Sequence, residues 1–514
     1  MYICDEIRQV DSLSVSSGGT QYCQKTGEFL ADPTGHVRLY LVKGADGWGA
    51  YTRKHELPAE AFREFDDVGL AVQLRISNPN GYMTPYKNIV QIPSGMRASI
   101  EGDKVEFGRD DLREFLIDNW SPTDRWDDEL LAWPGADASN TTMLLSGGMD
   151  SVAILLSHQL VGRPLRALHV ARPGVEHELA FAQEVSRQYA SGLDIAQFTS
   201  VTPDEAFTHL EFSPFGRSFN FPFYHRSMKS SLTTPFALHG ELSLVDMQFY
   251  DHGQRFRHMR REVFHNPRWR SILHGARAVG GHLPEFGGDA KIGTILRSLR
   301  TARNKRLFLL GTVLGPKGFP GIARSPFIRD DSAFVEAIND RFTPFIDATD
   351  DPKHFDIDFF LMAYRFVEGT SNKNGPQEAA MSVGHQTHHP MNKLEALLRQ
   401  VSITADAARD KTVLKKHFHE RFPDMKSVVY FEKNCSLGSP DPHYVRDANW
   451  SEITEDAINM LPQSRFVAKD AYADYLRGRM WGEPHINIAS LLKRRELALE
   501  QTRAAAPLAG ASAG

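Results

Sequence analysis

The pattern of apolar and polar positions changes along the chain. Over residues 1–105, short segments alternate apolar and polar side chains: HVRLYLVK, GLAVQLRI, NIVQIP and RASIEGDKVEFG. Gly, Asn and Pro separate these segments, which predicts strands joined by turns and therefore a β-rich region. The segment RDDLREFLIDNW, residues 109–120, instead has apolar residues at helical spacing and predicts a helix.

From residue 141 onward, short apolar segments alternate with amphipathic ones. TTMLL, RALHVA and LDIAQFTSV predict strands, whereas SVAILLSHQL and EHELAFAQEVSRQYA predict helices. Strands that alternate with helices form parallel sheets, so we predict an α/β fold whose parallel sheet has helices on both faces. From about residue 330 the pattern is mostly helical.

These changes predict several domains, as expected for a chain of 514 residues. We predict a β-rich domain over residues 1–120 and an α/β domain over 141–495. The segment between them, 121–140, is rich in Pro, Asp, Ser and Gly and predicts a linker. The small residues of RAAAPLAGASAG predict a disordered tail over 496–514.

Composition narrows the class of protein. Hydrophobic residues make up 41% of the chain, charged residues 24%, and the net charge is -5, so we expect no nucleic-acid partner. Three cysteines argue against a disulfide framework and fit a reducing compartment. The longest apolar run, LFLLGTVLG, is too short to span a membrane. We therefore expect a soluble cytoplasmic protein, with homo-oligomers left open.

The segment SGGMDS, residues 146–151, lies between a predicted buried strand and a predicted helix. A helix N-terminus presents unpaired N–H groups to anions, and Gly147 and Gly148 allow the backbone to approach an anion closely. Ser146 and Ser151 add hydroxyl donors. Asp150 would repel a phosphate unless a cation lay between them, which predicts a bridging Mg²⁺. The alternative is an ordinary glycine-rich turn that is capped by Asp and Ser.

SGGMDS resembles the PP-loop of N-type ATP pyrophosphatases, in particular the synthetase domain of asparagine synthetases. This group includes β-lactam synthetases and lasso-peptide cyclases. Weaker similarities extend the resemblance over about residues 80–425, in YMTPYKNIVQIPSGMRASIEGDKV, LHVARPGVEHELAFAQEVS, MSVGHQTHHPMNKLEALLRQV and DKTVLKKHFHERFPDM. The resemblance implies a HUP-like fold and an ATP- and Mg²⁺-dependent ligase. Such enzymes adenylate a carboxylate, release pyrophosphate and transfer the acyl group to an amine.

The family places a second metal-binding carboxylate in a Gly-x-Gly-x-Asp-Glu stretch about a hundred residues after the PP-loop. Here FALHGELSLVDMQFYD occupies that position, and Gly240 matches its first glycine. Asp246 is the candidate metal ligand, with Glu241 and Asp251 as alternates. The alternative is that these acids are surface residues beside a strand and bind no metal.

The resemblance also assigns a catalytic role to Lys411, which matches the lysine that stabilises the family's transition states. Lys415 follows one helical turn later, so we expect both lysines on one helix face, where they meet phosphate together. The alternative is that both are ordinary solvated lysines.

The segment GHQTHHPMN departs from the family pattern, which puts aspartate as substrate in doubt. We expect its histidines His388 and His389 to lie on a polar surface.

The N-terminal domain departs from the family as well. In asparagine synthetases it is a glutaminase whose nucleophilic cysteine directly follows the initiator Met, whereas this chain has Tyr2 there and its first cysteine is Cys4. The domain is also short. We therefore expect a truncated, glutaminase-like domain without its nucleophile, and an amine that comes from a small-molecule or peptide substrate.

Four functions are compatible with these residues. The leading hypothesis is an amide-forming ligase of specialised metabolism that acts on a small-molecule or peptide carboxylate and amine, with ring closure within one molecule as one form of this reaction. Asparagine synthesis from free ammonia is the conservative alternative. The others are a PP-loop enzyme that modifies nucleotides or tRNA, and a non-catalytic nucleotide-binding partner.

Overall fold

The structure is a computed structural model, and it describes the chain except for residues 77–82, 147, 172–175, 198–209, 211, 213–214, 216–219, 241–325, 330, 343–356, 359, 362–363, 366–370, 392, 404–410, 428–448, 479–482 and 506–514. The strands are β1 (Tyr2–Ile3), β2 (Arg8–Val10), β3 (Gln21–Cys23), β4 (Glu28–Leu30), β5 (Leu39–Gly44), β6 (Gly47–Tyr51), β7 (Ile89–Ile92), β8 (Met96–Glu101), β9 (Lys104–Asp110), β10 (Thr141–Leu144), β11 (Arg166–Ala171), β12 (Gly192–Gln197), β13 (Phe236–His239) and β14 (Gln386–His388). The helices are α1 (Asp67–Ile76), α2 (Asp111–Asn119), α3 (Met149–Leu160), α4 (Glu176–Tyr189), α6 (Asn220–Ser231), α13 (Asp331–Phe342), α15 (Ser371–Ser382), α16 (Leu394–Ser402), α18 (Thr412–Arg421), α19 (Asn449–Met460), α20 (Lys469–Arg477) and α21 (Glu483–Ala505).

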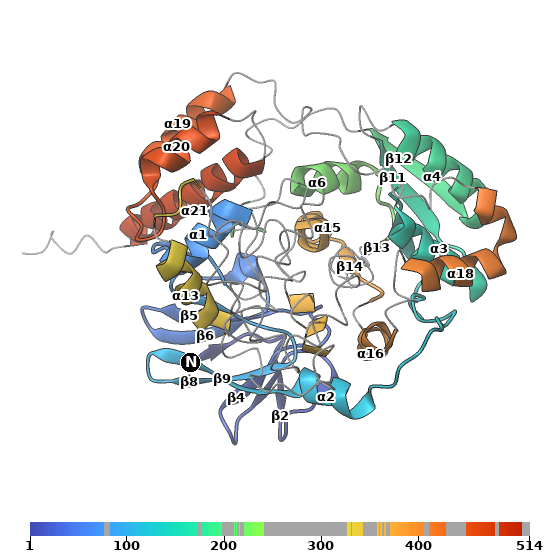
Figure 1. Ribbon diagram of the computed structural model, residues 1–514, viewed down its shortest axis with the longest axis horizontal. Helices are drawn as coiled ribbons and strands as arrows, with labels where there is room; N and C mark the ends of the chain where they lie inside the picture. The colour runs from blue at the N-terminus through green and yellow to red at the C-terminus, as the bar shows by residue number, and fades with distance from the viewer. Residues whose placement is uncertain are drawn as a thin grey trace, which may run out of the picture.

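Five strands form a parallel sheet in the order β12-β11-β10-β13-β14. Every neighbouring pair in this sheet is parallel. The chain passes from β10 through α3 to β11, and then through α4 to β12, as the alternation of strand and helix patterns predicts. The predicted parallel sheet is therefore confirmed (Figure 1).

Alternate residues of the sheet enter two separate hydrophobic clusters. Met143 and Leu145 pack with side chains of α3, α4, α16 and α18 on one face. Leu144 and Leu168 pack with side chains of α6 and α15 on the other face. Because side chains of a strand point alternately to its two sides, this division confirms that helices cover both faces.

The N-terminal region contains two mainly antiparallel sheets, in the orders β1-β6-β5-β7 and β2-β3-β4-β8-β9. Phe29 of β4 and Leu41 of β5 belong to one hydrophobic cluster, so the two sheets share a core. The predicted β-rich character of this region is confirmed.

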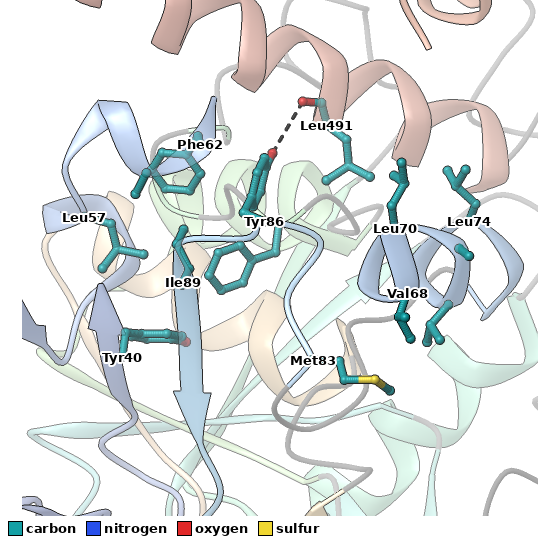
Figure 2. Close-up of a cluster of buried hydrophobic side chains, with 14 of the residues drawn as sticks. Tyr40, Leu57, Phe62, Val68, Leu70, Leu74, Met83, Tyr86, Ile89 and Leu491 are labelled. Atoms are coloured by element: carbon teal, nitrogen blue, oxygen red, sulfur yellow. Dashed lines mark hydrogen bonds between the residues drawn. The ribbon is translucent and has the colours of Figure 1, made fainter. Parts of the chain in front are cut away.

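Helices from the second half of the chain complete this N-terminal core. Side chains of α13, α20 and α21 belong to the same cluster as the two sheets. Figure 2 shows Leu491 of α21 against Tyr86, whose hydroxyl donates a hydrogen bond to the Leu491 carbonyl oxygen at 3.4 Å. Part of the segment predicted as a single α/β domain over 141–495 therefore packs on the β-rich region.

The predicted strand GLAVQLRI is wrong, because residues 67–76 form α1. Its alternating pattern does not reflect one exposed face, since Leu70, Ala71, Val72 and Gln73 are all buried. Periodicity cannot distinguish a strand from a helix that is buried on all sides. Asp66 directly precedes α1, and its carboxylate accepts a hydrogen bond from the Gly69 N–H at 2.7 Å, as N-cap residues do.

Two further predictions are corrected at the C-terminal side. Helix α21 continues to Ala505, so the predicted disorder over 496–514 is wrong for residues 496–505. Within the mostly helical part, Gln386–His388 forms β14, which extends the parallel sheet.

None of the described helices combines the length and hydrophobicity that crossing a bilayer requires.

The predicted linker, 121–140, contains no helix and no named strand, but it is packed against the α/β core. Its residues Trp126, Leu131 and Ala136 are buried there. His158 of α3 anchors the segment: its Nε2 accepts a hydrogen bond from the Trp133 N–H at 3.0 Å, and its Nδ1–H donates to the Ile154 carbonyl at 2.9 Å. This arrangement requires a neutral imidazole, and burial lowers the pKa of His158 to about 4.

The His158 contacts predict acid-sensitive stability. The unfolded chain binds a proton near pH 6.5 while the folded protein resists it to about pH 4, so the free energy of unfolding should fall as the pH drops through this window. Replacing His158 by Gln, which keeps a donor and an acceptor, should reduce the slope of stability against pH by up to about one proton. Urea denaturation at several pH values measures this slope. An equal slope in both proteins would contradict the assignment.

Candidate functional site

The SGGMDS segment follows β10 and leads into α3. Ser146 is exposed, and its Oγ accepts a hydrogen bond from the Gly148 N–H at 2.9 Å. Gly147 lies outside the described residues, so its predicted role stays a prediction. The loop therefore places one exposed hydroxyl beside the start of a helix.

Ser151 has a different position from the one we expected. Its side chain is buried, and its Oγ lies 2.8 Å from the Gly148 carbonyl oxygen and 3.1 Å from the Ser146 carbonyl oxygen. Because a hydroxyl has one proton to donate, the loop itself holds that proton in this structure. Ser151 thus closes the loop, whereas we had expected its hydroxyl to face a ligand.

The first turn of α3 has no side-chain cap. Gly148 is the N-cap residue, with an extended backbone at φ -79° and ψ 139°. The first N–H groups of a helix have no partner within the helix, and its dipole places partial positive charge at the same end. The start of α3 is therefore suited to an anion, as the sequence predicts.

Gly240, directly after β13, lies against this helix start. A Cβ atom at this position would be 2.4 Å from the Cα of Ser151 and 2.6 Å from its backbone N. Real Cβ atoms do not approach other atoms so closely, so only glycine fits while α3 keeps this position. Gly240 can lie this close to the helix start because it has no side chain.

The contact between Gly240 and Ser151 lies where the strand order of the parallel sheet reverses. Strands β11 and β12 lie on one side of β10, and β13 and β14 lie on the other side. Open parallel sheets bind ligands at this point, outside the carboxyl ends of the strands. Both the loop after β10 and Gly240 after β13 meet this condition.

Lys411 reaches the same place from a distant part of the sequence. Its Nζ lies 2.6 Å from Oδ1 of Asp150, although the two residues are 261 positions apart. Their side chains are 18% and 20% exposed, so the ion pair is partly shielded from water. Packing of Val413, Leu414 and α3 residues in one cluster brings the pair together.

The backbone of Lys411 is strained. Its φ of 57° and ψ of 31° are in the left-handed region, and it is the only non-glycine residue with positive φ in the described ranges. Such conformations cost about 1 kcal/mol or more and are concentrated at functional sites. The strain is a second, independent reason to regard Lys411 as a functional residue.

Lys415 does not share the environment of Lys411. Helix α18 begins at Thr412, and Lys411 precedes it with non-helical backbone. The helical spacing that was expected to place both lysines on one face therefore does not apply to this pair. Lys415 is half-buried, and in the part of the chain described here it has no polar contact with the loop.

The predicted second carboxylate cannot be placed. Asp246, Glu241 and Asp251 all lie outside the described residues. Within the described ranges no three His, Cys, Asp or Glu side chains cluster as metal ligands do. Asp150 alone still fits Mg²⁺, which proteins often hold through one or two carboxylates together with substrate phosphates.

The expectation of a polar surface at His388 and His389 is wrong. His388 stacks on Trp133, with ring centroids 3.9 Å apart, and burial lowers its pKa to about 4. His389 is buried, and its ring packs edge-on against His239 at 4.7 Å. The missed strand β14 explains both positions, since it places these histidines beside β13.

Comparison with protein-family models gives no match for this chain, and comparison with curated proteins gives none either. The resemblance drawn from SGGMDS therefore stays a hypothesis.

The fit of Gly240 against α3 predicts a size-dependent effect. Replacing Gly240 by Ala should destabilise the protein by about 1–3 kcal/mol, the usual cost of overpacking, and loosen the first turn of α3. Urea denaturation measures the first effect, and hydrogen exchange of the amides in 149–155 measures the second. Gly192→Ala in β12 is the matched control, because the atoms nearest to its Cβ would belong to the flexible Arg166 side chain, at 3.6 Å or more. Equal behaviour of the two variants would contradict this explanation.

Proposed function

We propose that this protein is an ATP-dependent amide-forming ligase of the asparagine synthetase-like type. The observation that carries the proposal is the meeting of Asp150 and Lys411 at the start of α3, beside Gly240. The family pattern assigns a role to each of these residues, and they come from separate segments of the chain. The sheet order and the position of the loop are also compatible with a PP-loop, HUP-like domain.

The site offers what a triphosphate needs. The N–H groups at the start of α3 and the ammonium of Lys411 supply positive charge, and exposed Ser146 supplies a hydroxyl. Asp150 supplies a carboxylate for a metal ion. Bound Mg²⁺ would neutralise part of the charge on the phosphates.

Two bond changes make up the proposed reaction. A substrate carboxylate oxygen attacks the α-phosphorus of ATP, and pyrophosphate leaves. A neutral amine then attacks the acyl carbon, AMP leaves, and the nitrogen loses a proton. Lys411 would hold the phosphates and, through its charge, stabilise the negative charge that develops during transfer. In this proposal Lys411 exchanges its contact with Asp150 for one with phosphate when the nucleotide binds.

The amine is proposed to come from a substrate other than glutamine. Cys4 is buried, and its Sγ lies 3.6 Å from Oγ1 of Thr52. A buried thiol that is not at the chain terminus lacks the α-amine that serves as base in N-terminal cysteine glutaminases. These features support a carboxylate and an amine that are both brought in as small molecules or as parts of a peptide.

A second candidate is a nucleotide-binding partner without catalysis. The observation that favours it is the same ion pair, because Lys411 supplies Asp150 with a resident cation. In that case ATP would bind at the helix start without a metal ion at Asp150. The two candidates therefore differ in whether Mg²⁺ strengthens binding and in whether an acid is activated.

Nucleotide binding tests the site without knowledge of the substrates. Isothermal titration should show that Mg²⁺ strengthens ATP binding to the wild type, and that Asp150→Asn removes this enhancement. Lys411→Met should weaken ATP binding by about tenfold or more, because a charge-assisted contact is lost. Lys416→Met on the same helix is the control and should bind as the wild type does, because Lys416 is exposed. No binding by the wild type, or full enhancement in Asp150→Asn, would reject the site.

Pyrophosphate exchange into ATP tests the activity itself. With a panel of carboxylic acids that includes aspartate, at least one acid should support exchange. Asp150→Asn and Lys411→Met should each lower the exchange rate by about 100-fold, the usual effect of removing one transition-state contact. A wild-type protein that binds Mg²⁺–ATP but exchanges pyrophosphate with none of the acids would support the non-catalytic candidate.

A further inference from the structure

A cavity of about 440 Å³ lies between the N-terminal region and the segment that runs from α15 into β14. The N-terminal region contributes Arg38, Tyr40 and Lys54, and the other wall contributes Glu378 and His385. This volume is in the range of cavities that hold small organic ligands. None of these residues belongs to the candidate nucleotide site.

A buried ion pair joins the two walls of the cavity. Lys54 Nζ contacts Oε1 of Glu378, and each side chain is only 9% exposed. Arg53, which also lines the cavity, pairs with Glu6. With Arg38, the lining has three basic side chains against two carboxylates, so its field favours a negatively charged group.

The far wall of the cavity has polar atoms that are buried without a hydrogen-bond partner in the described structure, among them Oε2 of Glu378, whose residue is 7% exposed, and Nδ1 of His385. Such atoms are rare, because each costs about 1–3 kcal/mol when no partner replaces water. An unsatisfied carboxylate oxygen beside a cavity is a ready acceptor for a ligand N–H or O–H.

The remaining lining provides contact area for carbon atoms. Tyr40, Phe212 and Met381 contribute apolar surface to the same cavity. The cavity thus combines a basic lining, one buried acceptor and apolar walls. A simple inorganic anion would leave the acceptor and the apolar walls without partners.

We propose that this cavity binds a small organic carboxylate that also carries a hydrogen-bond donor, such as an amino acid or a hydroxy acid. The ligand carboxylate lies toward the basic side chains of the N-terminal region. The ligand donor bonds to Oε2 of Glu378. Because its walls come from both parts of the molecule, a bound ligand links them. The proposal does not depend on the nucleotide site.

Three probes with the same carbon chain test this assignment on the full-length protein: 4-aminobutyrate, butyrate and butylamine. At neutral pH they carry both groups, only the carboxylate, and only the ammonium. Crystal soaks locate each probe, and NMR titration measures its affinity. We expect 4-aminobutyrate in the cavity, weaker binding of butyrate there, and no binding of butylamine there.

Glu378→Gln examines the acceptor. This variant should bind 4-aminobutyrate about tenfold less tightly, the effect expected for loss of one hydrogen bond to a charged group, with little change for butyrate. Glu395→Gln is the matched control, since Glu395 is exposed on α16 and outside the cavity lining. If Glu378→Gln fails to fold, the ranking of the three probes on the wild type decides.

Three results would overturn the proposal. They are binding of butylamine in the cavity as tightly as 4-aminobutyrate, density for 4-aminobutyrate only elsewhere, or no binding of 4-aminobutyrate at all. ATP binding measured on the same samples keeps this outcome distinct from failure of the ligase proposal, because the two sites share no described residue.

Discussion

The close contact between Gly240 and Ser151 is the constraint on which the candidate site depends. The end of β13 touches the first turn of α3, and the contact leaves no room for a side chain. As a result, the start of α3 is fixed beside the carboxyl ends of β10 and β13. The buried hydroxyl of Ser151 closes the loop at the same point. A helix N-terminus fixed in this way has its N–H groups in position before any ligand arrives, which lowers the cost of ordering them on binding.

The ion pair between Asp150 and Lys411 supplies the charged side chains at this helix start. Lys411 holds a left-handed backbone, and hydrophobic packing of α18 on the α/β core stabilises it there. A strained lysine beside a carboxylate at a helix start is difficult to explain by stability alone, because the cost of desolvating a mostly buried ion pair offsets much of its attraction. The arrangement is the one that the proposed nucleotide site requires, because Lys411 would exchange its contact with Asp150 for one with phosphate.

The two parts of the molecule are joined by more than the predicted linker. Helix α21 shares the core of the N-terminal sheets, and Arg365 donates hydrogen bonds to both carboxylate oxygens of Asp110 at 2.8 Å. The Lys54–Glu378 ion pair connects the same two parts at the cavity. The N-terminal region thus forms one wall of this cavity.

Most of the architecture follows from local patterns. The alternation of strands and helices after residue 141 predicted the parallel sheet, because each βαβ unit carries its own periodicity. The short strands β10, β11 and β12 were predicted for the same reason. The pattern failed at α1, whose residues are buried on all sides, and at β14, which is only three residues long. Both exist because tertiary neighbours cover them, and no local pattern records those neighbours.

The candidate site, too, could be predicted from the sequence only in part. The sequence by itself determined where the loop lies and predicted an anion site there, because glycines, serines and one aspartate between a strand and a helix are a local pattern. It also singled out Gly240 and Lys411, through resemblance. Only the tertiary structure decided that Lys411 contacts Asp150, that Gly240 abuts Ser151, and that His389 meets His239. These contacts join segments far apart in the chain, and their geometry is set by the packing of whole helices on the sheet, which no short stretch of sequence contains.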